Sequence, residues 1–189
     1  MSKLSRTIEQ IPKSYFSLND LVKISDLNKN SLKVSISRAI NDRSIIPLTR
    51  GLYTNRIAQI PWENLAISIY YPSYVSFESA LNYYNILSQQ SSALTLASSK
   101  RRKELNIQGQ IISYRHLKAE LFWGYIKKDD YLIAEAEKAF LDLAYLSLNG
   151  YAHFDSSEMN LDLLNRKKLK KYLKRFNNKK LDRLINQII

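Results

Sequence analysis

The sequence predicts a two-domain α+β protein, and two observations support this. Segments with helical periodicity alternate with short apolar runs that are typical of strands. Charge also divides the 189 residues, because residues 1–58 carry a net charge of +6, residues 59–157 a net charge of −1 and residues 158–189 a net charge of +7. A total of +12 favours a polyanionic partner, of which nucleic acid is the commonest. The absence of cysteine excludes disulfides and thiolate metal sites.

Three helices are expected near the N-terminus. The first ends over residues 8–11, before Pro12, and the second opens in residues 16–22, with Ser17 or Asn19 as its N-cap. Residues 27–30 read as a polar turn. The third helix spans residues 31–41, with an apolar face listed as Leu32, Ile36, Ala39 and Ile40.

A small hairpin follows these helices. Residues 45–48 and 51–54 read as strands, joined by a turn at Thr49 and Arg50. Helix, helix, turn, helix and hairpin is the order of a winged helix-turn-helix, which assigns residues 1–58 to DNA binding.

The third helix presents a small, polar and cationic face opposite its apolar side. Arg38 matches guanine, Asn30 or Asn41 matches adenine, and an outward Val34 suits a thymine methyl group. Arg50 at the hairpin tip suits phosphate or the minor groove. The predicted DNA-binding residues are Asn30, Ser31, Lys33, Val34, Ser37, Arg38, Asn41, Thr49 and Arg50. A solvated helix face and an ordinary turn are the alternative interpretation.

Residues 59–189 are expected to form a mixed α/β domain for partner control. Helices are predicted over residues 62–70, from residue 76, and over residues 133–148, 161–176 and 181–188. Strands are predicted over residues 93–97 and 110–114, with a loop between them over residues 100–103. Residues 125–131 are predicted to form a turn or a short hairpin. The last two helices are basic and amphipathic, which is typical of a membrane-surface element, a second nucleic-acid patch or a packing helix. Their charge favours DNA backbone or an acidic protein partner, with simple packing as the alternative.

A family resemblance covers roughly residues 14–148. Residues 16–53 followed by Pro61, residues 72–81 and residues 133–142 resemble, in order, three landmarks of the AbiEi-type antitoxins, and residues 50–53 resemble the family's wing. The family has Pro before the Glu-Lys pair where this chain has Ala136, and the basic tail after Glu158 matches no landmark.

The resemblance implies a DNA-binding antitoxin of a type IV toxin-antitoxin system. It implies a winged helix that binds operator DNA and represses its own operon. It also implies a C-terminal domain that counteracts a nucleotidyltransferase-type toxin.

Catalysis is not expected. Glu135, Glu137, Lys138 and Asp142, with Asp129 and Asp130 upstream, were they on neighbouring strands, would suggest a metal-dependent nuclease. Glu137 and Lys138 are instead adjacent on a helical segment, which favours an anchoring role for Glu137, Lys138 and Asp142. His116 and His153 have no metal-ligand spacing, and no Gly-rich phosphate loop is present. We therefore expect no catalytic residues, metal or cofactor.

No membrane segment is expected, and the absence of a visible signal peptide predicts a cytoplasmic protein. Three alternatives to an antitoxin stay open at this point: a plain transcriptional regulator, a metal-dependent nuclease and an RNA-binding module.

Overall fold

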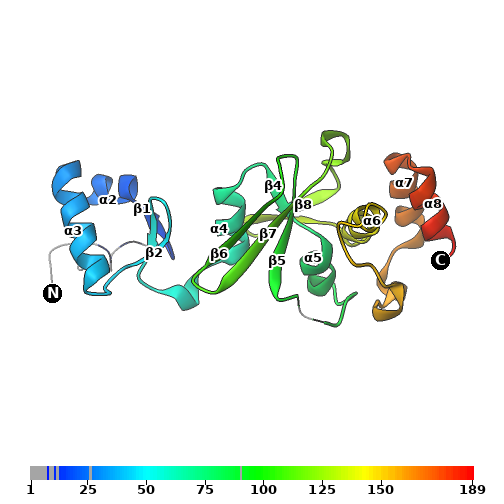
Figure 1. Ribbon diagram of the computed structural model, residues 1–189, viewed down its shortest axis with the longest axis horizontal. Helices are drawn as coiled ribbons and strands as arrows, with labels where there is room; N and C mark the ends of the chain where they lie inside the picture. The colour runs from blue at the N-terminus through cyan, green and yellow to red at the C-terminus, as the bar shows by residue number, and fades with distance from the viewer. Residues whose placement is uncertain (1–7, 9–10, 12, 26, 90) are drawn as a thin grey trace. The chain divides into compact units, whose positions relative to one another are not determined.

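The computed structural model describes residues 8, 11, 13–25, 27–89 and 91–189 (Figure 1). Helices and two separate sheets make it a mixed α+β structure, as predicted. The chain divides into two units, Met1–Pro61 and Trp62–Ile189, here called unit 1 and unit 2. In the described part of the chain, no helix has the length and apolar character needed to cross a membrane.

Unit 1 contains two described α-helices and a three-stranded antiparallel sheet. Its elements are β1 (Phe16–Ser17), α2 (Leu18–Ile24), α3 (Lys29–Asn41), β2 (Ile46–Thr49) and β3 (Leu52–Thr54). The strand order is β1-β3-β2, so β3 pairs with both of its neighbours. A 3₁₀ turn, Ile57–Gln59, follows the sheet.

Side-chain caps fix where the two described helices of unit 1, α2 and α3, begin. Ser17 caps α2 in a capping box with Asp20, which confirms one of the two predicted caps. The predicted polar turn over residues 27–30 is wrong in its second half. The side chain of Asn28 accepts a hydrogen bond from the Ser31 N–H at 2.9 Å, so that α3 already begins at Lys29.

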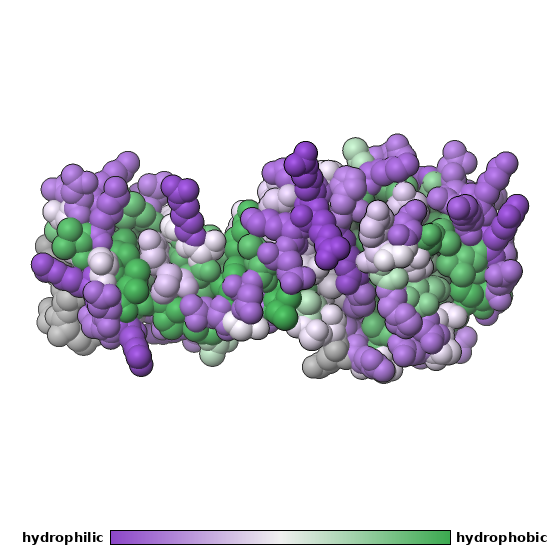
Figure 2. All heavy atoms as spheres, in the orientation of Figure 1, coloured by the Kyte–Doolittle hydropathy of each residue, from purple (hydrophilic) through white to green (hydrophobic). Residues whose placement is uncertain are grey.

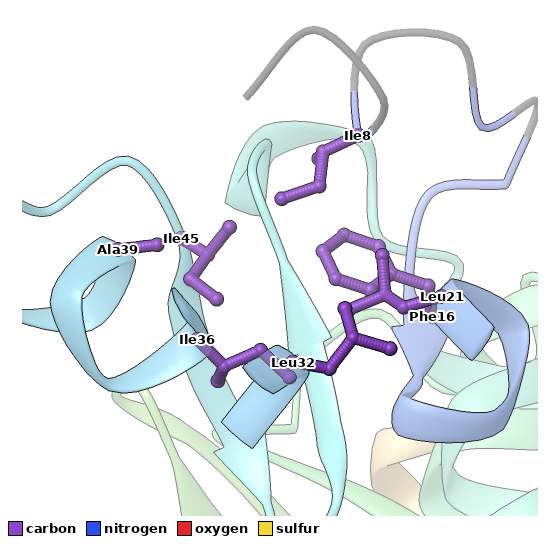
Figure 3. Close-up of a cluster of buried hydrophobic side chains, with 7 residues drawn as sticks. All are labelled: Ile8, Phe16, Leu21, Leu32, Ile36, Ala39 and Ile45. Atoms are coloured by element: carbon purple, nitrogen blue, oxygen red, sulfur yellow. The ribbon is translucent and has the colours of Figure 1, made fainter. Parts of the chain in front are cut away.

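The core of unit 1 lies between its helices and its sheet. Figure 3 shows the buried side chains that form it: Ile8, Phe16, Leu21, Leu32, Ile36, Ala39 and Ile45. The predicted apolar face of the third helix is confirmed, with Ile40 partly buried beside it. The predicted first helix lies largely outside the described residues, although Ile8 is buried in this core.

Unit 2 is built on a six-stranded mixed sheet with the order β6-β7-β5-β4-β9-β8. Its strands are β4 (Ser73–Val75), β5 (Ala93–Ser98), β6 (Lys103–Ile107), β7 (Gln110–His116), β8 (Tyr125–Lys128) and β9 (Tyr131–Ala134). The β5–β7 and β4–β9 pairs are parallel, and the other pairs are antiparallel.

Helices cover both faces of this sheet. The helices of unit 2 are α4 (Trp62–Ile69), α5 (Phe77–Tyr83), α6 (Ala136–Ser147), α7 (Arg166–Phe176) and α8 (Lys179–Asn186), with 3₁₀ turns at Ala119–Leu121, Ser156–Glu158 and Leu161–Leu163. Of these, α7 packs on α6, and α8 packs on α7. Successive side chains of β7 point to opposite faces. Tyr114 donates a hydrogen bond to the Ala66 carbonyl of α4, whereas Arg115 pairs with Glu78 of α5, so α4 and α5 lie on opposite faces.

Several predicted boundaries in unit 2 need correction. Ile133 and Ala134 belong to β9, because they pair with Ile126 and Tyr125, so the predicted helix over residues 133–148 begins only at Ala136. The helix predicted from residue 161 begins at Arg166, after a 3₁₀ turn. Lys103 opens β6 instead of ending a loop, and neither β4 nor β6 is predicted from the sequence.

Candidate nucleic-acid interface

The orientation of α3 is set by its buried apolar face. Leu32 is 0% exposed and Ile36 is 4% exposed, whereas Val34, on the other side of the helix, is 51% exposed. The outward position predicted for Val34 is therefore confirmed. A helix with one face in the core must present the opposite face to solvent.

The predicted residues of α3 are all exposed. At about 100° per residue they lie on the side opposite Leu32 and Ile36, with Ser31 and Lys33 at its edges. This set, here called the α3 polar face, is Asn30, Ser31, Lys33, Val34, Ser37, Arg38 and Asn41. The structure thus brings these residues onto one continuous solvent-facing surface.

Thr49 and Arg50 lie on a different element of unit 1. Thr49 ends β2 and is half-buried, while Arg50 is exposed in the turn between β2 and β3. Gly51 follows with a φ of +79°, in the left-handed region that L-residues with a Cβ adopt rarely, which explains the glycine at this tight turn.

The acidic side chains that the structure describes in unit 1 form no ion pair with these cations. The described acids are Asp20 and Asp42. Asp20 pairs with Lys13 at 2.9 Å and accepts from Ser17, and these contacts hold the pKa of its carboxyl far below the usual range. Asp42 accepts a hydrogen bond from the Ser44 backbone N–H at 2.9 Å, and its interactions with Ser44 lower its pKa as well. Among the described residues, Lys33, Arg38 and Arg50 have no carboxylate partner.

Two further cations lie at the two ends of α3 and are missed by the sequence analysis. Lys29 is the first residue of α3, and Arg43 follows its C-cap with a φ of 61°. Both side chains are exposed. Asn28 is a favoured N-cap residue, and a helix that begins directly after it includes Lys29. The prediction of a polar turn over residues 27–30 does not take this cap into account. No comparable local pattern marks Arg43.

The residues considered for nuclease chemistry lie in the core of unit 2. Lys138 and Asp142 form an ion pair with both side chains 0% exposed. Tyr74 and Ser76 donate hydrogen bonds to Asp142 at 3.1 and 2.9 Å. Burial lowers the pKa of Lys138 and raises the pKa of Asp142 and Tyr74. A phosphodiester outside the core cannot reach these groups, so the geometry favours anchoring of α6.

Glu137 is likewise engaged within unit 2. Its carboxylate accepts a hydrogen bond from the Asn165 backbone at 2.9 Å and lies 3.3 Å from Lys168. The Lys168 ammonium also pairs with Glu135 at 2.6 Å, and the Tyr172 hydroxyl donates to Glu135. These contacts tie the start of α7 to the start of α6.

Metal-ligating side chains do not gather in the part of the chain that the structure describes. No group of three or more His, Asp or Glu residues there could hold a metal ion. His116 uses Nδ1 to contact the Lys100 carbonyl at 2.9 Å, and His153 is exposed.

Comparison with protein-family models and with curated proteins finds no match for this chain. The resemblance to AbiEi-type antitoxins therefore rests on the residues quoted for it above.

Proposed function

We propose that the chain is a sequence-specific DNA-binding protein, in which unit 1 is a winged helix-turn-helix and α3 is the recognition helix. The observation that carries this proposal is the α3 polar face, which is exposed and has no acidic partner among the described residues. A solvated surface helix ordinarily mixes both charge signs, and α3 contains no acidic residue at all.

The arrangement around α3 supports this choice. α2 and α3 are joined by a short connection, and the β2–β3 hairpin follows directly, held to α3 by a hydrogen bond from the Ile45 N–H to the Ala39 carbonyl. A winged helix uses this order to present one helix to the major groove and a hairpin to the flanking backbone.

The side chains of the α3 polar face suit base edges. The Arg38 guanidinium can donate two hydrogen bonds to guanine, and the Asn30 or Asn41 amide can pair with adenine. An exposed Val34 costs free energy in water but meets a favourable partner in a thymine methyl group.

The start of α3 and the β2–β3 turn suit phosphate. The first turn of α3 contains the exposed Lys29 and no acidic residue, which favours an anion at this helix end. Arg50 in the β2–β3 turn adds a second cation on a separate element. Phosphate contacts at two elements would fix the register of α3 on the duplex.

The antitoxin role follows from the resemblance alone. We propose on that basis that unit 1 represses the chain's own operon and that unit 2 counteracts a nucleotidyltransferase-type toxin in the cytoplasm. A plain transcriptional regulator shares the DNA-binding part of this proposal. The gene that lies beside this one distinguishes the two, because an antitoxin requires a toxin gene as its neighbour.

Selection from a pool of randomised DNA duplexes tests the DNA-binding proposal. The full chain should enrich one motif, and Arg38→Ala should lose the preference at one base pair of it. Lys127→Ala, which removes an exposed cation of unit 2, is the matched control and should enrich the unaltered motif. Failure of the full chain to enrich any motif would contradict sequence-specific binding.

A further inference from the structure

The helix α7 is fixed to unit 2 by its apolar side. Leu169, Leu173 and Phe176 are buried, and the Asn165 side chain caps the first turn through the Lys168 N–H. Phe176 packs edge-on against Trp123, with ring centroids 5.5 Å apart. The rotation of α7 about its axis is therefore determined, and so is the face it turns to solvent.

That outward face is cationic along its whole length. Seven of the 11 residues of α7 are Lys or Arg. Five exposed ones line a single shallow surface depression, here called the α7 basic face: Lys167, Lys170, Lys171, Lys174 and Arg175. In Figure 2 hydrophilic side chains project from the end of unit 2 formed by α7 and α8.

The described carboxylates near α7 form no ion pair with the α7 basic face. Glu135 and Glu137 both hold Lys168, which lies on the flank of α7. Asp162 in the preceding 3₁₀ turn and Asp182 in α8 form no salt bridge with the α7 basic face in the described part of the structure. The face therefore keeps its positive charge.

This arrangement works against the stability of α7. Lys167 and Lys171, Lys170 and Lys174, and Lys171 and Arg175 stand four residues apart, and like charges at this spacing repel on a helix. Arg175 is restrained as well, since its guanidinium lies 4.1 Å from the Trp123 ring centroid. A bound polyanion would offset the repulsion between these cations, so the row of cations costs less free energy when a polyanion is bound.

We infer that the α7 basic face is a second DNA-binding surface, which contacts backbone phosphates without reading sequence. Lysine ammonium groups act as point charges on phosphate, and each contact releases condensed counterions. The inference rests on the proposed function for the choice of duplex DNA as the polyanion. It extends that function by giving unit 2 a share of the affinity and none of the sequence preference.

The test compares two variants of the full chain with equal loss of charge. Lys170→Gln, Lys171→Gln and Lys174→Gln together alter the α7 basic face. Arg101→Gln, Arg102→Gln and Lys127→Gln remove three exposed cations elsewhere in unit 2. The measured quantity is the slope of log affinity against log salt concentration on a mixed-sequence duplex.

The α7 variant should reduce the magnitude of this slope by about 2.7, since each lost phosphate contact removes about 0.9. The control variant should leave the slope at the value of the parent chain. An unchanged slope in the α7 variant, or equal reductions in both variants, would overturn the inference. Loss of binding to polyglutamate with an unchanged slope on DNA would overturn it in favour of an acidic protein partner.

A second readout separates this inference from the proposed function. The ratio of affinities for an enriched and a shuffled duplex should be the same in the α7 variant and the parent chain. If this ratio is close to one in the parent chain, the proposed sequence-specific function fails, while the slope comparison still decides the role of α7. A ratio that falls in the α7 variant would overturn the assignment of a sequence-independent role.

Discussion

Arg38 lies on the α3 polar face, with no carboxylate partner in the described structure. Arg38→Ala should therefore weaken binding to the preferred duplex by about 1–3 kcal/mol and relax the preference at one base pair. Titration of the preferred duplex and of single-base variants measures both effects. Equal weakening on every duplex would show that Arg38 contacts only phosphate.

Asp20 provides a pH-dependent contribution to unit 1. Its hydrogen bonds to Lys13 and Ser17 hold its pKa below the ordinary value of 3.8. A pKa lowered by folding means that the unfolded chain binds the proton more tightly. The stability from Asp20 is thus present above pH 3.8 and is lost as the pH falls through the folded pKa.

NMR titration of the Asp20 carboxyl carbon measures this pKa directly. We expect a midpoint well below 3.8 in the parent chain and a midpoint closer to 3.8 in Lys13→Ala, which removes the main cause of the shift. A midpoint at or above 3.8 in the parent chain would contradict the capping contacts described for α2.

At the scale of elements, periodicity predicts helices well where one face is buried. The spacing of Leu32, Ile36 and Ala39 identifies α3 and, by opposition, its polar face. The β2–β3 hairpin is predicted because apolar runs flank a turn that contains Gly51. The signals for these elements are local, so the sequence alone contains them.

Elements that depend on distant partners are not predicted. β1 consists of two residues, which are a strand only because Phe16 and Ser17 pair with Tyr53 and Leu52. β4 has three residues and is defined by its pairing with β5 and β9. Such short strands carry too few residues for a period of two to show.

The start of α6 shows how an apolar run can mislead. Ile133 and Ala134 are buried and fit the helical spacing of the residues that follow, yet they form the end of β9. Periodicity cannot separate a buried strand from a buried helix over so short a run. For α7 the sequence predicts a basic amphipathic helix, but it does not distinguish a helix that only packs from one that also binds a polyanion.

The anchoring of α6 gives an element-scale prediction. Asp142→Ala leaves the Lys138 ammonium buried without its partner and should lower the free energy of unfolding of unit 2 by about 3–5 kcal/mol. Both tryptophans, Trp62 and Trp123, lie in unit 2, so tryptophan fluorescence during denaturant unfolding reports on this unit.

Two companion variants make this measurement decisive. Glu120→Ala, which breaks the exposed contact with Lys118, should change the stability by at most about 1 kcal/mol. Lys138→Met combined with Asp142→Leu should recover part of the loss, because it leaves no unpaired charge in the core, although the Tyr74 and Ser76 hydroxyls lose their acceptor. A small effect of Asp142→Ala would show that the ion pair does not anchor α6.

At the scale of the whole molecule, the two proposed activities should separate. The α3 polar face belongs to unit 1, whereas the antitoxin role is proposed for unit 2. Replacing Lys33, Arg38 and Arg50 together by Ala should abolish autorepression and leave protection against the toxin intact. All three side chains are exposed, so each change should cost at most about 0.5 kcal/mol of stability.

Co-expression with the toxin from an unrelated promoter measures protection without any contribution from autorepression. The control carries three substitutions outside unit 1, Arg101→Ala, Arg102→Ala and Lys127→Ala, and should keep autorepression. A folded triple variant of unit 1 that loses protection together with DNA binding would show that the two roles are not divided between the units.

The central claim is that α3 reads base sequence, and one ratio tests it most directly. The full chain is titrated with an enriched duplex and with a shuffled duplex of equal length at one salt concentration. We predict that the parent chain binds the enriched duplex about 10³-fold or more tightly and that this ratio falls by about 5- to 150-fold in the Lys33, Arg38 and Arg50 triple variant, because Arg38 reads one base pair. A ratio that survives in a folded triple variant would contradict the claim, because sequence would then be read by a surface other than α3.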